Sequence, residues 1–404
     1  MEQTRKKTCV ERDKDSDKDK NTRDPDNTLK SWEALTYDVL CVIFKYLNGL
    51  DLSNASKVCR TWLEAANSEK RTRGPMCLTR NIKEMGYVVS GWEDIKTESI
   101  RYSSVKPSLA LFFTTIGLEG SLSQRCHCDF LPPNCDSVSL DTYGVVINNT
   151  ETGEDSENIV CMFLPEVSNI EISTLALNLD DWEETLSAYC KQVKATHEAS
   201  SDSDCHKESC LMLFCEWDGR TIAVELLKSL KRWFPKTKPC IWGGIAKDIS
   251  LCNSVNNTRV CRNSANCIAV VLSGTKMKTW SVLLDANCNT KEKVEDELRA
   301  FRDSVQLKKH SVGFMFACCI RGVNMFNENN VESIIFKRFF PKVPLVGCFG
   351  DGEFGKRILN VISETSRKKR IKCISAWVIP REDKVVKSGP RKGILTLVMI
   401  QWFT

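Results

Sequence analysis

The alternation of apolar and polar positions divides the chain into three parts. Residues 1–30 are almost wholly polar, with lysine and aspartate alternating, so they bury too little apolar surface to offset the entropy cost of ordering. Over residues 31–75 apolar side chains recur at helical spacing. Beyond Gly91 short β-rich runs alternate with amphipathic stretches. The pattern predicts a disordered charged tail, a small all-α unit and a large α/β region.

The apolar stripe of residues 31–75 predicts two helices. The first helix is marked by Val39, Leu40, Ile43 and Leu47. The Asn48-Gly49 pair predicts its end, and Asp51 is expected to cap a second helix that continues to about Ala66. A unit of about forty residues without a metal or disulfide framework is too small to be stabilised by its own core alone. We therefore expect it to dock on a partner surface.

The second half of the chain contains one strand-helix-strand pattern twice. Residues 210–244 and 312–350 each begin with an apolar strand and an Arg/Gly turn. An amphipathic helix ending in Lys-Arg-aromatic-Phe-Pro-Lys follows, and then a second strand that closes on glycine. A repeat this long suits two sister subdomains rather than a solenoid. We expect an α/β (α+β) region with related subdomains at 92–265 and 266–404.

Each copy is expected to hold its two strands in parallel, joined by a helical crossover. The turns at Gly243 and Gly350 should then face a shared cleft. Several further apolar runs predict strands, at residues 108–115, 143–147, 158–164, 267–273 and 393–403. A polar, Ser- and Asp-rich stretch at residues 196–209 predicts a surface loop.

Composition excludes several classes of protein. With 404 residues and 42% hydrophobic content, the chain is long enough for two or three domains. It has no apolar run of signal-peptide or membrane-span length, so we expect a soluble intracellular protein with no membrane partner. The 21 cysteines are scattered in apolar runs, where reduced thiols behave as small hydrophobes. The net charge of +5, without interleaved aromatic residues, does not favour nucleic acid.

The helical unit resembles an F-box. The stretch LTYDVLCVIFKYLNGLDLSNASKVCRTWLEAA closes on Val58, Cys59, Arg60 and Trp62, which match the family signature. It departs at Thr36, where the family usually has proline, but threonine can also begin a helix as its cap. The resemblance implies an apolar face that docks on a Skp-type adaptor. The residues expected to present or support this face are Leu35, Leu40, Ile43, Leu47, Val58 and Trp62.

The remainder resembles the N-terminal and C-terminal parts of a FIST domain. The resemblance is carried by residues 313–322 and 338–355, and more weakly by 240–245. Together with an F-box it implies a non-catalytic substrate receptor of a Skp-cullin-F-box ubiquitin ligase. Such a receptor reaches cullin and RING subunits through the adaptor, binds a target protein for degradation and needs no cofactor. It would be cytoplasmic and nuclear. The alternative is a sensor of a small, amino-acid-like ligand that the F-box tethers.

The turn VGCFGDGEFG at residues 346–355 is the strongest candidate for a recognition site. It matches GxGxxG behind a strand but lacks the Lys-Ser/Thr of a P-loop, and its carboxylates would repel a pyrophosphate. Because parallel strands deliver their ends to one edge, residues ending the preceding strand should lie nearby. The expected ligand- or substrate-binding residues are Cys318, Arg321, Glu332, Asp351 and Glu353. The alternative is a structural turn in which Glu353 merely pairs with Arg321.

Three other motifs carry weaker signals. Cys126, His127, Cys128 and Cys135 have the wrong spacing for a zinc site, so we expect cysteines of a surface loop and no metal. The basic cluster at 367–372 suits either nuclear import or a solvated turn. Cys318 is a poor candidate nucleophile: the nearest histidine in sequence, His310, would lie at the far end of the same strand, roughly 26 Å away.

Overall fold

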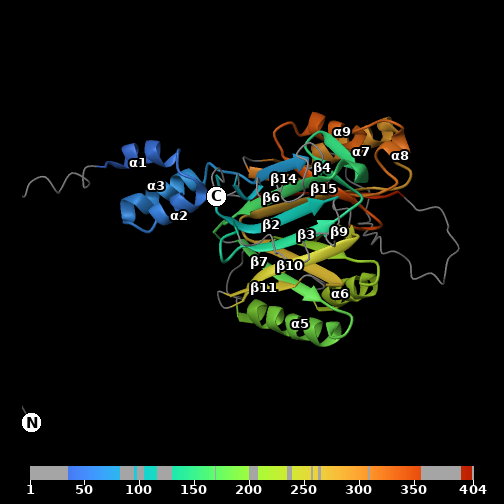
Figure 1. Ribbon diagram of the computed structural model, residues 1–404, viewed down its shortest axis with the longest axis horizontal. Coiled ribbons are helices and arrows are strands. Elements are labelled where there is room, and N and C mark those ends of the chain that lie inside the picture. Colours follow the sequence, from blue (N-terminus) through green and yellow to red (C-terminus); the bar gives the residue numbers. More distant parts are fainter. Residues whose placement is uncertain are drawn as a thin grey trace, which may run out of the picture.

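The computed structural model describes residues 35–81, 95–97, 104–115, 130–168, 170–199, 208–233, 239–255, 258–262, 265–307, 310–355 and 393–402. Within these ranges a small helical unit adjoins a larger body of three sheets (Figure 1). The expected charged tail and the basic cluster at 367–372 lie outside them. No helix in the described part of the chain is long and apolar enough to span a membrane.

The helical unit contains three helices where the sequence predicted two. These are α1 (Tyr37–Phe44), α2 (Gly49–Ala55) and α3 (Arg60–Lys70). The cap of α2 is Asn48 rather than the expected Asp51, because the Asn48 side chain accepts a hydrogen bond from the Asp51 backbone amide at 2.8 Å. The single second helix that we expected is broken between Ala55 and Arg60.

The three helices pack around a small apolar core. Its fully buried members are Leu40, Phe44, Leu52, Ala55, Ala65 and Ala66. Trp62 packs edge-on against Phe44, with ring centroids 5.3 Å apart. Six buried side chains, three of them alanines, make a small core, so the dependence of this unit on neighbouring surfaces stays a prediction.

The sheet-rich body repeats one four-strand unit three times. When the four strands of a unit are numbered along the chain, they lie side by side in the order 1-4-2-3. Strands 2 and 3 are parallel, and the other neighbouring strands are antiparallel. Unit 1 consists of β1 (Met76–Asn81), β2 (Pro107–Thr114), β3 (Asp136–Asp141) and β6 (Asn158–Pro165). Unit 2 consists of β7 (Ile170–Leu177), β8 (Glu208–Cys215), β9 (Cys240–Ile245) and β12 (Cys267–Gly274). Unit 3 consists of β13 (Met277–Leu284), β14 (His310–Cys318), β15 (Leu345–Gly350) and β17 (Leu395–Trp402).

The three units interlock by exchanging strands. Between its third and fourth strands, each unit sends an insertion to the third strand of another unit's sheet. The insertions are β4 (Gly144–Ile147) with β5 (Thr150–Gly153), β10 (Asp248–Val255) with β11 (Thr258–Arg262), and β16 (Glu353–Gly355). Unit 1 gives to unit 3, unit 3 to unit 2, and unit 2 to unit 1, through the pairs β4–β15, β16–β9 and β10–β3. The exchange is cyclic, so no unit completes its sheet alone.

This arrangement corrects the expected two subdomains. The two predicted copies are units 2 and 3, whose strand pairs β8–β9 and β14–β15 are parallel as expected. The sheets do not divide at residue 265, because β12 pairs with β7 and β8. Gly243 and Gly350 lie in equivalent strands at different positions, since Gly350 ends β15 while Gly243 is followed by two more residues of β9.

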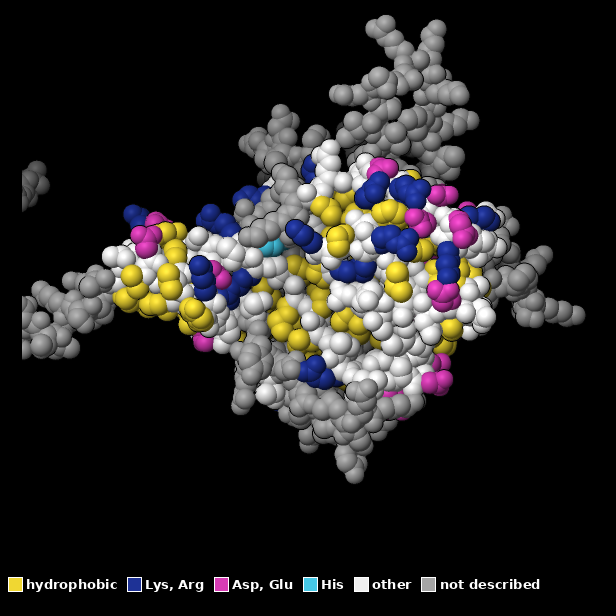
Figure 2. Space-filling model, turned by 90° about the horizontal axis from the view of Figure 1, so that it is seen from above, with side chains coloured by type: hydrophobic (Ala, Val, Ile, Leu, Met, Phe, Trp, Pro, Cys, Tyr) yellow, Lys and Arg dark blue, Asp and Glu magenta, His cyan; other side chains and the backbone are white. Residues whose placement is uncertain are grey.

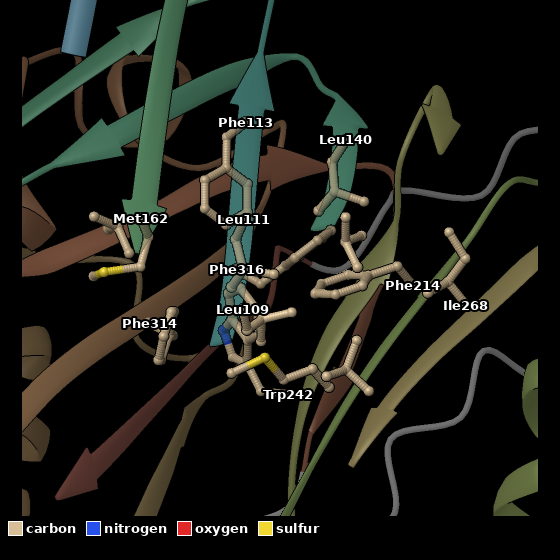
Figure 3. Packing of buried hydrophobic residues seen from close by; sticks show 14 of the residues in the cluster. Leu109, Leu111, Phe113, Leu140, Met162, Phe214, Trp242, Ile268, Phe314 and Phe316 are labelled. Carbon is tan, nitrogen blue, oxygen red and sulfur yellow. The ribbon is translucent and has the colours of Figure 1, made fainter. Parts of the chain in front are cut away.

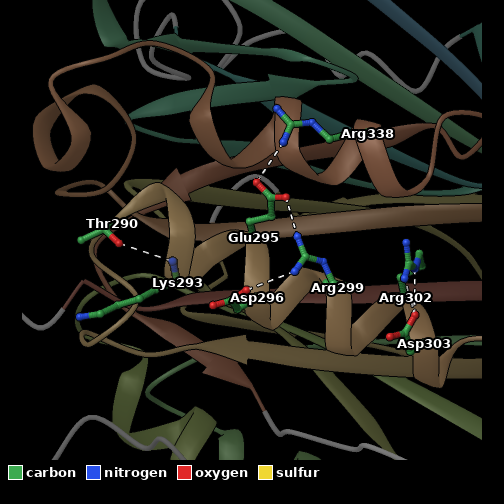
Figure 4. A network of polar contacts seen from close by, with 8 residues as sticks. All are labelled: Thr290, Lys293, Glu295, Asp296, Arg299, Arg302, Asp303 and Arg338. Atoms are coloured by element: carbon green, nitrogen blue, oxygen red, sulfur yellow. Dashed lines mark hydrogen bonds and ion pairs between the residues drawn. The ribbon is translucent and has the colours of Figure 1, made fainter.

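Helices cover the outer faces of two sheets. On unit 2 these are α5 (Trp182–Ala199) and α6 (Arg220–Trp233); on unit 3 they are α7 (Lys291–Ser304), α8 (Val323–Phe326) and α9 (Val331–Phe339). The loop expected at 196–209 therefore begins later, because Thr196–Ala199 still belong to α5. On the surface Glu295 of α7 binds both Arg299 and Arg338, which ties α7 to α9 (Figure 4).

The inner faces of the three sheets meet in one shared core. Trp242 of β9 lies at its centre and contacts phenylalanines from the second strand of every unit. The ring centroids of Phe113, Phe214, Phe314 and Phe316 lie 6.3, 5.4, 5.1 and 6.1 Å from Trp242 (Figure 3). Because this cluster draws on β2, β8 and β14 together, the three units fold as one body.

Candidate functional site

The helical unit exposes many large apolar side chains. Of the thirteen large apolar side chains exposed in the described chain, eight lie in this unit. They are Tyr37, Val39, Val42, Ile43, Tyr46, Leu50, Val58 and Leu63. Figure 2 shows apolar side chains gathered on this lobe. Exposed apolar side chains concentrated on so small a unit are typical of a surface that binds another molecule.

The residues expected to bind an adaptor divide between this surface and the core. Ile43 and Val58 are exposed, at 41% and 57%. Leu35, Leu47 and Trp62 are half-buried and pack against the core of the unit. Leu40 is fully buried, so it can only support the surface and cannot contact a partner.

Arg73 joins the helical unit to the body. Its Nη2 donates to the Phe44 carbonyl at the end of α1 and its Nη1 to the Ser104 carbonyl in the body, at 2.9 and 2.7 Å. Its Nε binds Glu69 at 2.9 Å. His310 at the start of β14 adds a hydrogen bond to the Arg71 carbonyl at 2.7 Å. The Arg73 and His310 contacts link the helical unit to the body.

The glycine-rich turn after β15 is packed against neighbouring backbone. A Cβ on Gly350 would lie 2.3 Å from the Phe316 ring and 2.5 Å from the Ile245 carbonyl oxygen. The Ile245 amide donates to Gly352 O at 2.7 Å, and the Asp351 amide donates to Ile245 O at 2.9 Å. The two strand ends thus touch directly, in place of the shared cleft that we expected between them.

Arg321 is buried, and protein groups occupy its guanidinium. Its Nε donates to Glu332 Oε1 at 2.5 Å, its Nη1 to Gly393 O at 2.8 Å and its Nη2 to Cys288 O at 2.9 Å. The alternative in which Glu353 is the partner of Arg321 is therefore wrong in detail, because the ion pair forms with Glu332. Arg321 organises loops around the end of β14.

Cys318 and Glu353 lie together beside this ion pair. Burial raises the pKa of Glu353 to about 8, opposed by a hydrogen bond from Cys318 and by the charge of Arg321. A hydrogen bond with Cys319 and burial raise the pKa of the Cys318 thiol far above its ordinary value. Since a nucleophilic cysteine must be a thiolate, this environment opposes such a role. His310 lies at the other end of β14, as expected.

Glu151 belongs to this cluster although the sequence did not reveal it. Its carboxylate accepts the Ser333 amide at 2.7 Å near the start of α9, and its own amide donates to Asn330 at 2.6 Å. Burial and the neighbouring Glu332 raise the pKa of Glu151 to about 7. Glu151 comes from the inserted β5 of unit 1, about 180 residues from α9, so only knowledge of the strand exchange could have placed it.

The structure thus brings together four of the five expected ligand-binding residues, Cys318, Arg321, Glu332 and Glu353. All four are buried, while Asp351 is half-buried in the turn. A ligand would have to displace the Arg321–Glu332 pair to reach both charges. A binding role for these residues stays a prediction.

Of the four residues in the weak zinc motif, Cys135 lies in the described part of the chain. Cys126, His127 and Cys128 lie outside the described residues, and Cys135 is buried rather than in an exposed loop. Among the residues that the structure describes, no group of three or more His, Cys, Asp or Glu side chains is arranged to hold a metal ion.

Comparison with known proteins agrees with this division into helical unit and body. The F-box domain family matches residues 32–74. Human F-box only protein 22 is 22% identical over 339 residues, which cover 78% of this chain and 82% of the human protein. F-box only protein 22 of Pongo abelii is 23% identical over 314 residues, covering 73% of this chain and 74% of that protein. The chain therefore carries an F-box domain at residues 32–74, followed by a sheet-rich α/β body.

Proposed function

We propose that the chain is the substrate-recognition subunit of a Skp-cullin-F-box ubiquitin ligase. The observation that supports this most strongly is an F-box domain whose core is closed while eight large apolar side chains remain exposed on it. Exposed aromatic and aliphatic side chains of this kind are typical of a docking surface. The F-box binds a Skp-type adaptor there, and the adaptor connects the chain to the cullin and RING subunits.

The body holds the target protein in this proposal. The similarity to F-box only protein 22 extends over most of the chain and so includes the body. Holding a target raises its effective concentration beside the ubiquitin-loaded enzyme, and proteasomal degradation follows. The chain then needs no catalytic group of its own. The raised pKa of the Cys318 thiol fits a receptor better than a cysteine enzyme.

The test replaces exposed apolar residues of the F-box and measures adaptor binding by the full-length chain. Ile43→Asp and Val58→Asp place a charge in the docking surface without touching the core. We expect each to lower adaptor affinity at least thirtyfold, since hot-spot residues contribute about 2 kcal/mol or more. The melting temperature should not change.

The matched control is Leu179→Asp, an exposed apolar residue of the body, which should leave adaptor binding intact. Full binding by both F-box variants would overturn the adaptor assignment. If the assignment holds, target proteins are those that bind the chain directly and accumulate when Ile43→Asp replaces the native chain in cells. A set of bound proteins whose levels do not change would contradict the degradation step.

The alternative of a small-molecule sensor gains less support from the geometry. An amino-acid-like ligand needs a cation and a carboxylate to bind its two charges. Arg321 and Glu332, the best candidates for these roles, are buried and bind each other at 2.5 Å. We therefore favour the receptor function.

A further inference from the structure

Two cysteines face each other across the β10–β11 hairpin, which completes the sheet of unit 1. Cys252 and Cys261 are direct partners in the antiparallel register. Both are reduced thiols. Cross-strand partners project their side chains from the same face of the sheet, so the two sulfur atoms lie on one side of the hairpin.

The register places this pair where a disulfide fits. Val255 and Thr258 pair across a connection of two residues, so they are the hydrogen-bonded pair that closes the hairpin. Beyond this closing pair, non-hydrogen-bonded and hydrogen-bonded pairs alternate along the hairpin. Cys252–Cys261 is the third pair after the closing one. It is therefore non-hydrogen-bonded, with Cα atoms about 4.5 Å apart. Disulfides span Cα separations of about 4.4–6.8 Å.

The two thiols differ in exposure and already touch. A hydrogen bond joins their side chains. Cys261 is exposed to solvent. Cys252 is 5% exposed and belongs to the buried apolar cluster that includes Phe112 and Phe163 of the unit 1 sheet. A reagent in solution can therefore reach Cys261 first, and Cys252 is held as the resolving thiol behind it.

No other described thiol pair combines register with exposure. Cys215 and Cys267 are direct antiparallel partners too, and Cys210 faces Cys240 across parallel strands, but all four are buried. Cys59 is exposed but lies at the start of α3, outside any strand. These cysteines provide internal controls for the chemistry at the hairpin.

The surroundings of the two thiols decide which of them reacts first. Burial raises the pKa of the Cys252 thiol to about 12, with the Cys261 thiol adding to the rise and the Arg259 guanidinium opposing it. Arg259 itself is anchored, since its Nη2 donates to the Leu131 carbonyl at 2.8 Å and its Nη1 to the Cys135 carbonyl at 3.4 Å. Cys252 stays protonated near neutral pH, so the first attack falls to Cys261.

We propose that Cys252 and Cys261 form a reversible disulfide when the protein meets a peroxide. The Cys261 thiolate attacks the peroxide O–O bond, which gives a sulfenic acid and releases hydroxide that is protonated to water. The Cys252 sulfur then attacks the Cys261 sulfur, the S–S bond forms, and the S–O bond breaks with loss of a second water. Two thiols lose two electrons and one peroxide gains them. Two equivalents of a small thiol reverse the reaction by exchange.

The disulfide would crosslink the last two strands at one edge of the unit 1 sheet. It ties β11, which pairs only with β10 in this sheet, to the strand that joins unit 2 to β3. Exposed disulfides in reducing compartments are usually transient and regulatory rather than structural. The hairpin is thus a modification site on the body that is separate from the F-box.

The test treats the full-length chain with hydrogen peroxide, alkylates the remaining thiols and digests with trypsin. Cleavage after Lys247, Arg259 and Arg262 separates the two cysteines, so a disulfide joins peptide 248–259 to peptide 260–262. We expect this linked species, two hydrogen atoms lighter than the sum of its parts. It should vanish after incubation with glutathione.

Variants and internal controls make the result decisive. Cys252→Ser should leave a Cys261 sulfenic acid that accumulates and reacts with dimedone, and Cys261→Ser should abolish both products. If Cys252→Ser does not fold, Cys252→Ala serves in its place. Cys215 and Cys267 should stay reduced in the folded chain. The proposal is overturned if peroxide modifies the exposed Cys59 while peptides 248–259 and 260–262 remain unlinked, or if they link only after denaturation.

Discussion

At the scale of single residues, the end of β14 is built around buried charge. Arg321 satisfies its guanidinium with Glu332 and three backbone carbonyls, while Glu151 and Glu353 crowd the same region with further carboxyl groups. Removing one partner of a buried ion pair usually costs more than the pair contributes, because the other charge is left uncompensated. The side chains that the sequence marked as ligand-binding therefore hold the loops of unit 3 together.

Glu353 should make the stability of the body depend on pH. Its pKa rises from the ordinary value of 4.5 to about 8 in the folded chain, so between these values the folded state holds a proton that the unfolded state has lost. Stability should then fall as pH rises from about 4.5 to 8, by at most about 1.4 kcal/mol per pH unit from this group. Glu353→Gln cannot ionise and should lose less stability over that window. Urea unfolding at pH 5, 6.5 and 8 measures the difference.

The control for this experiment is Asp296→Asn, which changes an exposed carboxylate on α7 and should keep the slope of the native chain. Identical slopes for the native chain and Glu353→Gln would show that the Glu353 carboxyl is ionised in the folded protein. Glu151, with a pKa raised to about 7 in the folded chain, would then remain as a second contributor to the pH dependence.

At the scale of elements, the sequence was most informative where a pattern is local. The paired strands β8–β9 and β14–β15 and the helices α6 and α9 between them were predicted, because each depends on periodicity within about forty residues. The break between α2 and α3 was missed because both helices share one apolar stripe. Nothing local distinguishes the insertions β4–β5 and β16 from strands that stay in their own sheet, so the exchange and the position of Glu151 could not be predicted.

The glycines after β15 show the difference between a local signal and its cause. Their number correctly marked a special turn, but the reason is the close approach of backbone from another unit rather than a ligand. Ile245 O comes from β9, which is about a hundred residues earlier in the chain. A composition of glycine and acid fits both causes, and only the fold decides between them.

Replacing Gly350 should therefore destabilise the body. In Gly350→Ala the new methyl group would lie 2.3 Å from Phe316, which is fully buried, and 2.5 Å from a backbone oxygen, so neither neighbour can move easily. We expect a loss of about 1–3 kcal/mol in the free energy of unfolding, typical of overpacking. The matched variant is Gly153→Ala, whose Cβ would meet no atom within 4 Å at a φ of −82°. It should be neutral within about 0.5 kcal/mol. Equal effects of both variants in urea unfolding would contradict this account.

At the scale of the whole molecule, three interlocked units form one body, and Arg73 and His310 link the F-box to it. Each unit lends strands to another, and Trp242 joins all three units in one core. The sequence showed two of the three copies, because the residues between Thr114 and Asp136 do not repeat the Lys-Arg-aromatic-Phe-Pro-Lys sequence of the other two. A body of interlocked sheets suits a receptor, which must hold a bound target at a set distance from the enzyme that modifies it.

Arg73 should help to set the distance between a bound target and the enzyme that modifies it. Its guanidinium joins the end of α1 to Ser104 of the body, and its side chain is only 9% exposed. Arg73→Ala removes these charge-assisted hydrogen bonds, which contribute about 2 kcal/mol in such a setting, so the undocked population should rise about thirtyfold. We expect amide exchange at residues 71–76 and 104–107 to quicken by a similar factor, while adaptor binding is retained and ubiquitin transfer to a bound target slows. Arg338→Ala, which removes an exposed arginine of the α7–α9 network, should change neither. Unchanged exchange in Arg73→Ala would show that the F-box is held by its apolar contacts alone, whereas faster exchange within α1 together with lost adaptor binding would mean that Arg73 stabilises the F-box itself rather than its orientation.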